Sequence, residues 1–489
     1  MNLDRRHCYS ALKSRDERFD GRFFATVLTT GVYCRPICPA PTPRPENVRF
    51  VPCAAAAEEA GFRPCLRCHP ETSPGTPAWL GASSTVSRAL RLISDGALDE
   101  ASVEDLAGRL GIGERHLRRL FEKHLGASPV AVAQTRRTHF AKKLIDETSL
   151  PVTEIAYIAG FSSIRRFNDI FRKSFGKSPS QCRRGKTGDD EPEDSRLCLR
   201  LAYRPPFDWR ALSGFLRARA IPGVESIDET AYRRTVRIGD ASGVIEVRPI
   251  EGRSHLLLSV PPALSKGLAQ IAERVRRLFD LKADPVEITN HLKQDPALAD
   301  AIRSRPGLRV PGAWDGFEIG VRAILGQQVS VSAATTLSGR LVEACGDALL
   351  AADRNGLRYL FPDPERLSRE KLTNIGLPSK RAEAIREFAR AVRDGAVELT
   401  TSASLESTIE RLTALSGVGA WTAHYIAMRA LGEPDAFPSG DLVLRRAAAR
   451  RRGETLRESD LLERAEQWRP WRAYAALYLW TSYTNRNGA

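Results

Sequence analysis

The 489-residue sequence contains no apolar run near the roughly 18–20 residues that a membrane-spanning helix needs. Its first twenty residues are charged, which is not the pattern of a secretory signal. Cysteine is sparse, and only four of the nine cysteines stand in close pairs, which argues against a disulfide framework. We therefore expect a soluble, cytoplasmic protein that makes no membrane contact.

Acidic residues are too few to balance the basic ones. The 59 Asp and Glu face 74 Lys and Arg, for a formal charge of +15 and a pI near 9.6. Residues 1–186 hold 30 basic against 19 acidic residues, so most of the excess lies in the front of the chain. This balance favours a polyanionic partner. The length suggests about three or four domains.

The four paired cysteines have the spacing of a metal site. Cys34 and Cys38 are followed after 26 residues by Cys65 and Cys68. Paired thiolates at this spacing can close a tetrahedral site on Zn²⁺. Most sites of this kind are structural and hold together a domain with a thin core. The remaining cysteines are interpreted as buried or incidental thiols, namely Cys8, Cys53, Cys182, Cys198 and Cys345.

The residues around these cysteines resemble a known domain. Segments 29–36, 46–50 and 60–68 are similar to the N-terminal domain of Ada, the methylation-response regulator. The resemblance implies that residues 1–76 bind one Zn²⁺ through the four cysteines, and that Cys34 accepts a methyl group from a DNA methylphosphotriester. It also implies that Thr30 and Arg67 approach the phosphate. Residues 39–43, Pro-Ala-Pro-Thr-Pro, stand where such domains often carry arginines.

Methylation of Cys34 would change the charge of this site. Zinc keeps the sulfur as a thiolate, which is the nucleophilic form. Four thiolates outweigh the charge of Zn²⁺, so the site repels DNA phosphates until one thiolate is alkylated. We expect one methyl per protein and a rise in DNA affinity.

Residues 79–184 contain an internal repeat of about fifty residues. In each copy a short helix, a glycine turn and a second helix are predicted. The second helices carry an apolar face, and several of their other positions are basic, which suits two helix-turn-helix units in the major groove. A solvated basic face is the alternative for either helix alone. The segment resembles an AraC-type domain, and its DNA-contacting candidates are Arg115, Arg118, Arg165 and Arg166.

An acidic linker is predicted at 185–195, followed by an α+β segment at 196–286. Strands are expected at 197–203, 234–238, 244–247 and 255–260, and helices at 209–220 and 265–280. No acidic, histidine or cysteine cluster stands out in this segment, so we interpret it as a scaffold.

Residues 287–489 are predicted to be helical, and their main feature is a glycine hairpin near the C-terminus. Apolar residues before and after Gly417-Val418-Gly419 fit two helices joined by a tight turn. Such a turn exposes backbone N–H groups that can bind phosphate. Asp441 is expected to cap a helix from Leu442 to Arg450, and capping is the ordinary role for an Asp after Ser-Gly.

From about Tyr203 to Tyr483 the chain resembles the AlkA-type 3-methyladenine DNA glycosylases of the helix-hairpin-helix superfamily. The resemblance implies that Asp441 is the catalytic carboxylate, that Trp421, Tyr425 and Trp480 line the base pocket, and that Gln328 fills the gap left by a flipped base. It further implies DNA contact at Gly417 and Gly419. A monovalent cation on the carbonyls of Thr413, Leu415 and Val418 is a further expectation.

Three motifs are missing. The position where lyase-competent relatives carry a lysine holds Trp421, so no Schiff base is expected there. A C-terminal four-cysteine cluster for iron and sulfur is absent, and so is a Pro-Cys-His-Arg motif. We therefore expect a monofunctional glycosylase without an alkylguanine methyltransferase domain.

Together these observations predict a multidomain, mainly α protein with α+β parts. Its domains are a small Cys₄ zinc domain (1–76), a double helix-turn-helix domain (79–184), a linker (185–195), an α+β TBP-like subdomain (196–286) and a helix-hairpin-helix glycosylase domain (287–489). The expected partners are alkylated and promoter double-stranded DNA and RNA polymerase, in the bacterial nucleoid. Two alternatives remain: a glycosylase with non-switching DNA-targeting domains, and a regulator with an inactive glycosylase half.

Overall fold

The computed structural model describes residues 4–77, 84–184, 196–349, 356–399, 403–449 and 454–487. The chain divides into two compact units: Met1–Pro205 with Val247–Glu273 and Leu281–Asp284, and Pro206–Glu246 with Arg274–Asp280 and Pro285–Ala489. The predicted linker 185–195 and residue Trp79 lie outside the described residues. Within the described ranges, we find no helix with the length and apolarity needed to cross a bilayer.

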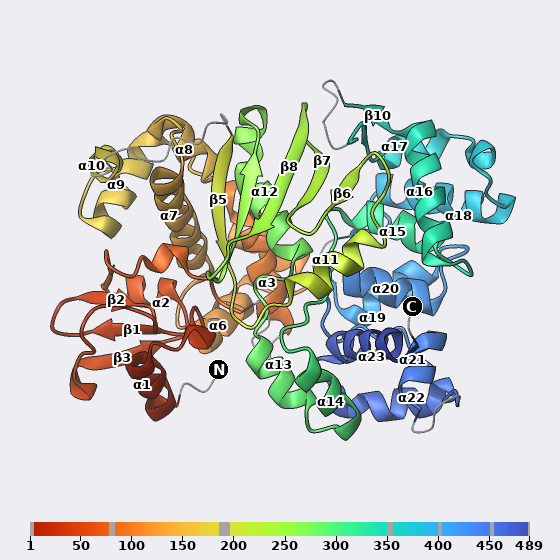
Figure 1. The fold of residues 1–489 in the computed structure, drawn as a ribbon. Coiled ribbons are helices and arrows are strands. Elements are labelled where there is room, and N and C mark those ends of the chain that lie inside the picture. The colour runs from red at the N-terminus through yellow and green to blue at the C-terminus, as the bar shows by residue number, and fades with distance from the viewer. Residues whose placement is uncertain are drawn as a thin grey trace. The chain divides into compact units, whose positions relative to one another are not determined.

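The first unit begins with a small four-stranded sheet of order β3-β1-β2-β4 (Figure 1). Its elements are α1 (Arg5–Ser14), η1 (Glu17–Phe19), β1 (Phe24–Val27), β2 (Val32–Cys34), η2 (Pro45–Asn47), β3 (Val48–Val51), α2 (Ala54–Glu59), β4 (Arg63–Pro64) and η3 (Pro70–Thr72). Strand β1 pairs antiparallel with β2 and β3, and β2 pairs parallel with β4. All four residues of β1 are buried, because this is an inner strand of a very small domain.

The next segment of the first unit is helical and shows the predicted repeat. It comprises α3 (Ser84–Ser94), α4 (Ala97–Glu100), α5 (Val103–Arg109), α6 (Glu114–Leu125), α7 (Pro129–Glu147), α8 (Val152–Ile158), α9 (Ile164–Phe175) and α10 (Pro179–Arg184). The pairs α5–α6 and α8–α9 are the two predicted helix-turn-helix units. Gly126 and Gly176 end α6 and α9 with φ of 62° and 71°, a region that glycine adopts without strain.

The α+β segment matches its sequence prediction closely. It contains β5 (Leu197–Ala202), α11 (Trp209–Arg217), β6 (Glu225–Ile227), β7 (Tyr232–Ile238), β8 (Ala241–Pro249), β9 (His255–Val260), η4 (Pro262–Gly267) and α12 (Leu268–Leu278). The sheet order is β5-β9-β8-β7-β6, and the boundary between the two units falls within β8. The prediction missed β6, because three residues are too few to show alternation.

The rest of the second unit is helical apart from two short strands. Its elements are α13 (Pro285–Leu292), α14 (Pro296–Ser304), α15 (Gly316–Leu325), α16 (Val331–Cys345), β10 (Asp347–Ala348), β11 (Tyr359–Leu360), α17 (Pro364–Arg369), η5 (Leu372–Ile375), α18 (Ser379–Arg393), α19 (Leu405–Thr413), α20 (Ala420–Arg429), α21 (Leu442–Ala447), α22 (Glu458–Ala465), η6 (Glu466–Trp468) and α23 (Arg472–Asn487). Helix α21 is shorter than predicted: it ends at Ala447, and Arg450 lies outside the described residues.

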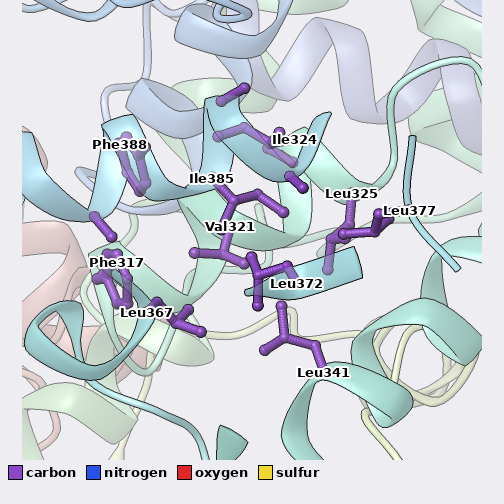
Figure 2. Close-up of a cluster of buried hydrophobic side chains, with 14 of the residues drawn as sticks. Phe317, Val321, Ile324, Leu325, Leu341, Leu367, Leu372, Leu377, Ile385 and Phe388 are labelled. Carbon is purple, nitrogen blue, oxygen red and sulfur yellow. The ribbon is translucent and has the colours of Figure 1, made fainter. Parts of the chain in front are cut away.

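A buried apolar cluster holds these helices together (Figure 2). Phe317, Val321 and Ile324 share one face of α15, and Phe388 on α18 stacks on Phe317 with ring centroids 5.7 Å apart. Ala423 and Ile426 of α20 belong to the same cluster, although they come from about a hundred residues later in the chain. Each fully buried Leu, Ile or Phe stabilises the fold by roughly 1.5–3 kcal/mol. This core fixes α15 and α20, which carry the residues described next.

Candidate functional site

Asp441 lies at the first turn of α21, and its carboxylate is held from three sides. Oδ1 accepts the backbone N–H of Leu444 at 2.9 Å, which confirms the predicted helix cap. The same oxygen accepts the indole N–H of Trp480 at 3.0 Å, and Oδ2 accepts that of Trp421 at 3.0 Å. The two indoles come from α23 and α20. The carboxylate is therefore fixed between two aromatic side chains, and it remains partly exposed.

Two of the three aromatic residues of the predicted base pocket, Trp421 and Trp480, contact this carboxylate, and the third, Tyr425, packs on Trp421. Trp421 and Tyr425 stand one turn apart on α20, and their rings stack at 5.2 Å with 10° between the planes. Burial raises the pKa of Tyr425, but the charges of Arg429, Arg219 and Arg322 outweigh burial and hold it below its ordinary value.

The other C-terminal aromatics behave differently from Trp480. Trp468, Trp471, Tyr474 and Tyr478 are at most 5% exposed and belong to the core. These four aromatic residues are therefore core residues, whereas Trp480 contacts the Asp441 carboxylate.

The glycine hairpin between α19 and α20 requires glycine at only one of its two positions. Gly417 has φ of +77°, and a Cβ there would lie 2.6 Å from the Cβ of Ala384 on α18. Gly419 has φ of −84°, and a Cβ there would meet nothing within 4 Å. Gly419 forms the N-cap of α20 without a side-chain hydrogen bond.

This difference gives a stability prediction. We expect Gly417→Ala to destabilise the protein by about 2–4 kcal/mol, because a strained left-handed alanine would also overlap Ala384. Gly419→Ala is the matched control and should change the free energy of unfolding by less than about 1 kcal/mol. Urea denaturation of the two variants checks both values, and equal losses would contradict the argument.

The loop after α15 carries Gln328, the residue predicted to fill the gap left by a flipped base, and it is bonded to the hairpin. Gln328 is exposed and has φ of +56°, an uncommon conformation for a residue other than glycine. Gln327, which the sequence analysis did not select, donates from Nε2 to the carbonyl of Gly417 at 2.8 Å and to the hydroxyl of Thr422 at 3.0 Å. Arg381 donates to the carbonyl of Gln327 at 2.7 Å. These bonds fix the base of the Gln328 loop on the hairpin.

His424 on α20 makes the stability of the second unit depend on pH. Burial, and to a smaller extent the charge of Arg472, lowers the pKa of its imidazole to about 4. An unfolded histidine titrates near 6.5, so between these pH values only the unfolded chain binds the proton. We expect the free energy of unfolding to fall by up to about 3 kcal/mol as the pH drops from 6.5 to 4.

Urea denaturation across this pH range checks the expectation. His424→Gln should remove that part of the pH dependence, whereas the same change at the exposed His116 should leave it intact. An unchanged pH profile in His424→Gln would contradict the assignment.

The paired cysteines of the first unit converge as their spacing predicts. The sulfurs of Cys34, Cys38, Cys65 and Cys68 all lie within 4.8 Å of one another, and all four residues are buried. Tetrahedral zinc with Zn–S bonds near 2.3 Å places its sulfurs about 3.8 Å apart, which fits this cluster. The other cysteines lie outside it: Cys8, Cys53 and Cys345 are buried, and Cys182 and Cys198 are half-buried.

A cavity of about 520 Å³ adjoins the cysteine cluster. Cys34, Cys38 and Cys65 form part of its wall, and Thr30 and Arg67 lie on its rim as exposed residues. Phe175, the last residue of α9, also lines it, so the second helix-turn-helix unit ends beside the cysteine site.

The candidate DNA-contacting arginines are exposed on α6 and α9. Arg115 and Arg118 lie on α6, and Arg165 and Arg166 lie on α9. Arg118 pairs with Glu114 one turn earlier, with N and O 2.5 Å apart. The apolar faces of both helices are buried, as predicted: Leu117, Phe121, Phe167 and Phe171 are fully enclosed.

Comparisons with known protein families match four segments of the chain, in the same order as the domains predicted from the sequence. The metal binding domain of Ada matches residues 7–71, a helix-turn-helix domain 106–185, the AlkA N-terminal domain 198–315, and the HhH-GPD superfamily base excision DNA repair protein 321–473. A probable bifunctional transcriptional activator/DNA repair enzyme AlkA from Mycobacterium tuberculosis (strain CDC 1551 / Oshkosh) is 42% identical over 486 residues, 99% of this chain and 97% of the relative. The chain belongs to this family of Ada-type regulators fused to AlkA-type glycosylases.

Two partial matches cover the glycosylase half of this fusion family. DNA-3-methyladenine glycosylase 2 of Escherichia coli (strain K12) is 36% identical over 283 residues, 57% of this chain and 95% of the relative. The 3-methyladenine DNA-glycosylase from Archaeoglobus fulgidus shares the fold, with a TM-score of 0.52 and 24% identity over 59% of this chain and 99% of its own. The predicted family and fold class are confirmed. The chain combines a zinc-binding, DNA-binding regulator with a DNA repair glycosylase.

Proposed function

We propose that the C-terminal half hydrolyses the N-glycosidic bond of alkylated bases of the 3-methyladenine type in double-stranded DNA, with Asp441 as the catalytic carboxylate. Breaking this bond leaves a sugar with oxocarbenium character, which a nearby carboxylate stabilises. The supporting observation is the position of Asp441, whose two oxygens are held by the indoles of Trp421 and Trp480. Its charge is thus fixed beside the aromatic surfaces that would hold the base.

The other residues predicted for the glycosylase site have the following roles in this proposal. A flipped, cationic alkylated base is held on Trp421, Tyr425 and Trp480 by stacking and cation–π attraction, worth roughly 0.5–2 kcal/mol per contact. Gln328 fills the gap in the duplex, and the hairpin at Gly417 and Gly419 binds a phosphate. With Trp421 in the lysine position, base release is monofunctional.

A monovalent cation would strengthen the phosphate contact at the hairpin. The carbonyls of Thr413, Leu415 and Val418 are the ligands we propose. The Leu415 carbonyl already accepts the N–H of Val418 at 3.1 Å. A second lone pair of that oxygen is available to a cation.

We propose that Cys34 accepts a methyl group from a DNA methylphosphotriester and thereby raises the affinity for promoter DNA. The cluster of four sulfurs fits zinc, which would keep Cys34 as a thiolate. The neighbouring cavity, with Thr30 and Arg67 on its rim, offers space for the uncharged triester and a positive charge for the phosphodiester anion that leaves when the methyl–oxygen bond breaks. Methylation removes one negative charge from the site, so DNA phosphates are repelled less.

The regulator reads promoter DNA through α6 and α9, with Arg115, Arg118, Arg165 and Arg166 at the duplex, and then activates RNA polymerase. We place the protein in the bacterial cytoplasm, with the nucleoid. The domain boundaries proposed from the sequence complete this description: 1–76, 79–184, 185–195, 196–286 and 287–489.

Two measurements separate this proposal from its alternatives. Release of 3-methyladenine from methylated DNA by the purified chain tests the glycosylase, and no release would favour a regulator with an inactive repair half. Promoter affinity before and after exposure to methylphosphotriester DNA tests the switch. An unchanged affinity would favour a glycosylase whose front half only delivers it to DNA.

A further inference from the structure

Arg429, the last residue of α20, is a buried guanidinium without an acidic partner among the described residues. It is 3% exposed. It donates to the carbonyls of Pro311 and Gly312, and its Nη1 donates to the Tyr425 hydroxyl at 2.5 Å. A buried charge is normally paired with an opposite one. This one is instead directed at a proposed pocket residue.

A second guanidinium, that of Arg219, is close enough to Tyr425 for its charge to lower the pKa of the hydroxyl. Phe215 on α11 has Arg219 over its ring at 3.7 Å and Arg429 at 5.0 Å. Arg219 also contacts no carboxylate among the described residues, and its Nη1 donates to the Phe215 carbonyl at 3.2 Å. The hydroxyl end of Tyr425 therefore faces uncompensated positive charge.

The opposite end of the same aromatic pair faces negative charge. Tyr425 stacks on Trp421, and the Trp421 indole donates to Asp441. The order of groups is thus carboxylate, indole, phenol and guanidinium. A base held on these rings would have Asp441 on its sugar side and Arg429 beyond Tyr425.

This polarity matches the charge movement of base release. When the bond between C1′ and the base nitrogen breaks, its electron pair stays on the nitrogen. A cationic base becomes neutral and a neutral base becomes anionic, while the sugar gains the positive charge until water adds to C1′ and gives its proton to the carboxylate or the solvent. A fixed negative charge at the sugar and a fixed positive charge near the base both favour this movement.

We propose that Arg429 is a positioning residue of the glycosylase that acts through Tyr425 and keeps the base end of the pocket electropositive. This inference rests on the proposed function of Asp441 and its pocket. A charge-based role of Arg429 predicts a specific kinetic signature. The positive charge weakens ground-state binding of a cationic base but speeds bond cleavage, because the repulsion disappears as the base becomes neutral.

Three variants separate charge from hydrogen bonding. Arg429→Gln keeps an N–H donor for the carbonyls and removes the charge, Arg429→Lys keeps the charge, and Tyr425→Phe removes the contact but leaves Arg429 in place. Single-turnover cleavage and equilibrium binding are measured on duplexes that contain one 7-methylguanine, a cationic base, or one hypoxanthine, a neutral base. Thermal unfolding shows whether each variant is folded.

We expect Arg429→Gln to lower the single-turnover rate on 7-methylguanine roughly tenfold, with equal or tighter binding. Tyr425→Phe should also lower the rate, because Arg429 acts through Tyr425, but it should not tighten binding, because the charge remains. Arg429→Lys should stay within about threefold of wild type. A rate in Arg429→Gln equal to wild type, or equal losses in the Gln and Lys variants, would overturn the inference. If Arg429→Gln does not fold, the Tyr425→Phe rate decides. Failure of the wild-type chain to release 3-methyladenine from methylated DNA would instead refute the proposed glycosylase function.

Discussion

Asp441→Asn should reduce the excision of 3-methyladenine from methylated DNA by about 10³-fold. Asparagine is as good a helix cap as aspartate, and its remaining oxygen can still accept the Leu444 N–H. The fold should therefore survive, while the negative charge held between Trp421 and Trp480 is lost. Release of radiolabelled 3-methyladenine, measured with enzyme in excess over DNA, gives the rate.

The structure supplies a matched control for this variant. Glu458 is an exposed carboxylate that accepts the Ser439 hydroxyl at 2.7 Å, two residues before Asp441. Glu458→Gln removes a negative charge near the same helix end and should leave excision unchanged. If Asp441→Asn excised the base as fast as wild type, or if both variants lost the same activity, Asp441 would not be the catalytic carboxylate.

Cys34→Ser should abolish methyl uptake from DNA that contains methylphosphotriesters. The methyl group needs a thiolate to attack it, and a serine hydroxyl is far too weakly acidic to replace a zinc-bound sulfur. Intact-mass measurement of the wild-type chain should show a gain of one methyl, and peptide mapping should place it on Cys34. Without the transfer, promoter affinity should not rise after exposure to methylated DNA.

Two further cysteine variants show whether a loss is specific. Cys198→Ser changes a half-buried thiol outside the cluster and should still accept one methyl. Cys38→Ser also removes one zinc ligand but leaves the Cys34 sulfur in place, so residual uptake there would separate acceptance from zinc binding. Zinc content is measured for each variant. A methyl mapped to any other cysteine would rule out the proposed role of Cys34.

Local sequence patterns predicted the elements that depend on neighbouring residues. The repeat of helix, glycine turn and helix at 79–184 predicted α5, α6, α8 and α9. The spacing of apolar residues along a helix, and the glycines at its ends, are both visible within a short stretch of sequence. The same holds for the hairpin at Gly417 and for the cap at Asp441. The cysteine spacing predicted the cluster, because two short pairs need only one loop closure to meet.

The scaffold role given to residues 196–286 stays a prediction, and the structure adds contacts of this segment that its sequence did not show. No acidic cluster was visible in that sequence, yet Glu225 lies in a buried ionic network with Arg322 at 3.0 Å. Arg322 also pairs with Glu318 at 3.0 Å, and Glu318 pairs with Arg234 at 2.7 Å. The partners come from distant positions in the chain, so no local pattern could show them. Breaking such a pair leaves a buried charge uncompensated.

The sequence by itself determined the fold class, the cysteine site, the hairpin and the identity of Asp441 as a helix cap, since each is encoded by spacing or by backbone preference. Only the tertiary structure decided what surrounds Asp441. Trp480 donates to it from 39 positions away, Gln327 donates to the hairpin carbonyl from 90 positions away, and Arg429 donates to the hydroxyl of Tyr425, which stacks on Trp421. These contacts form because the apolar faces of α15 and α20 are buried in one shared core. Helices that are far apart in the chain are packed together there, and no local sequence pattern shows which helices will meet.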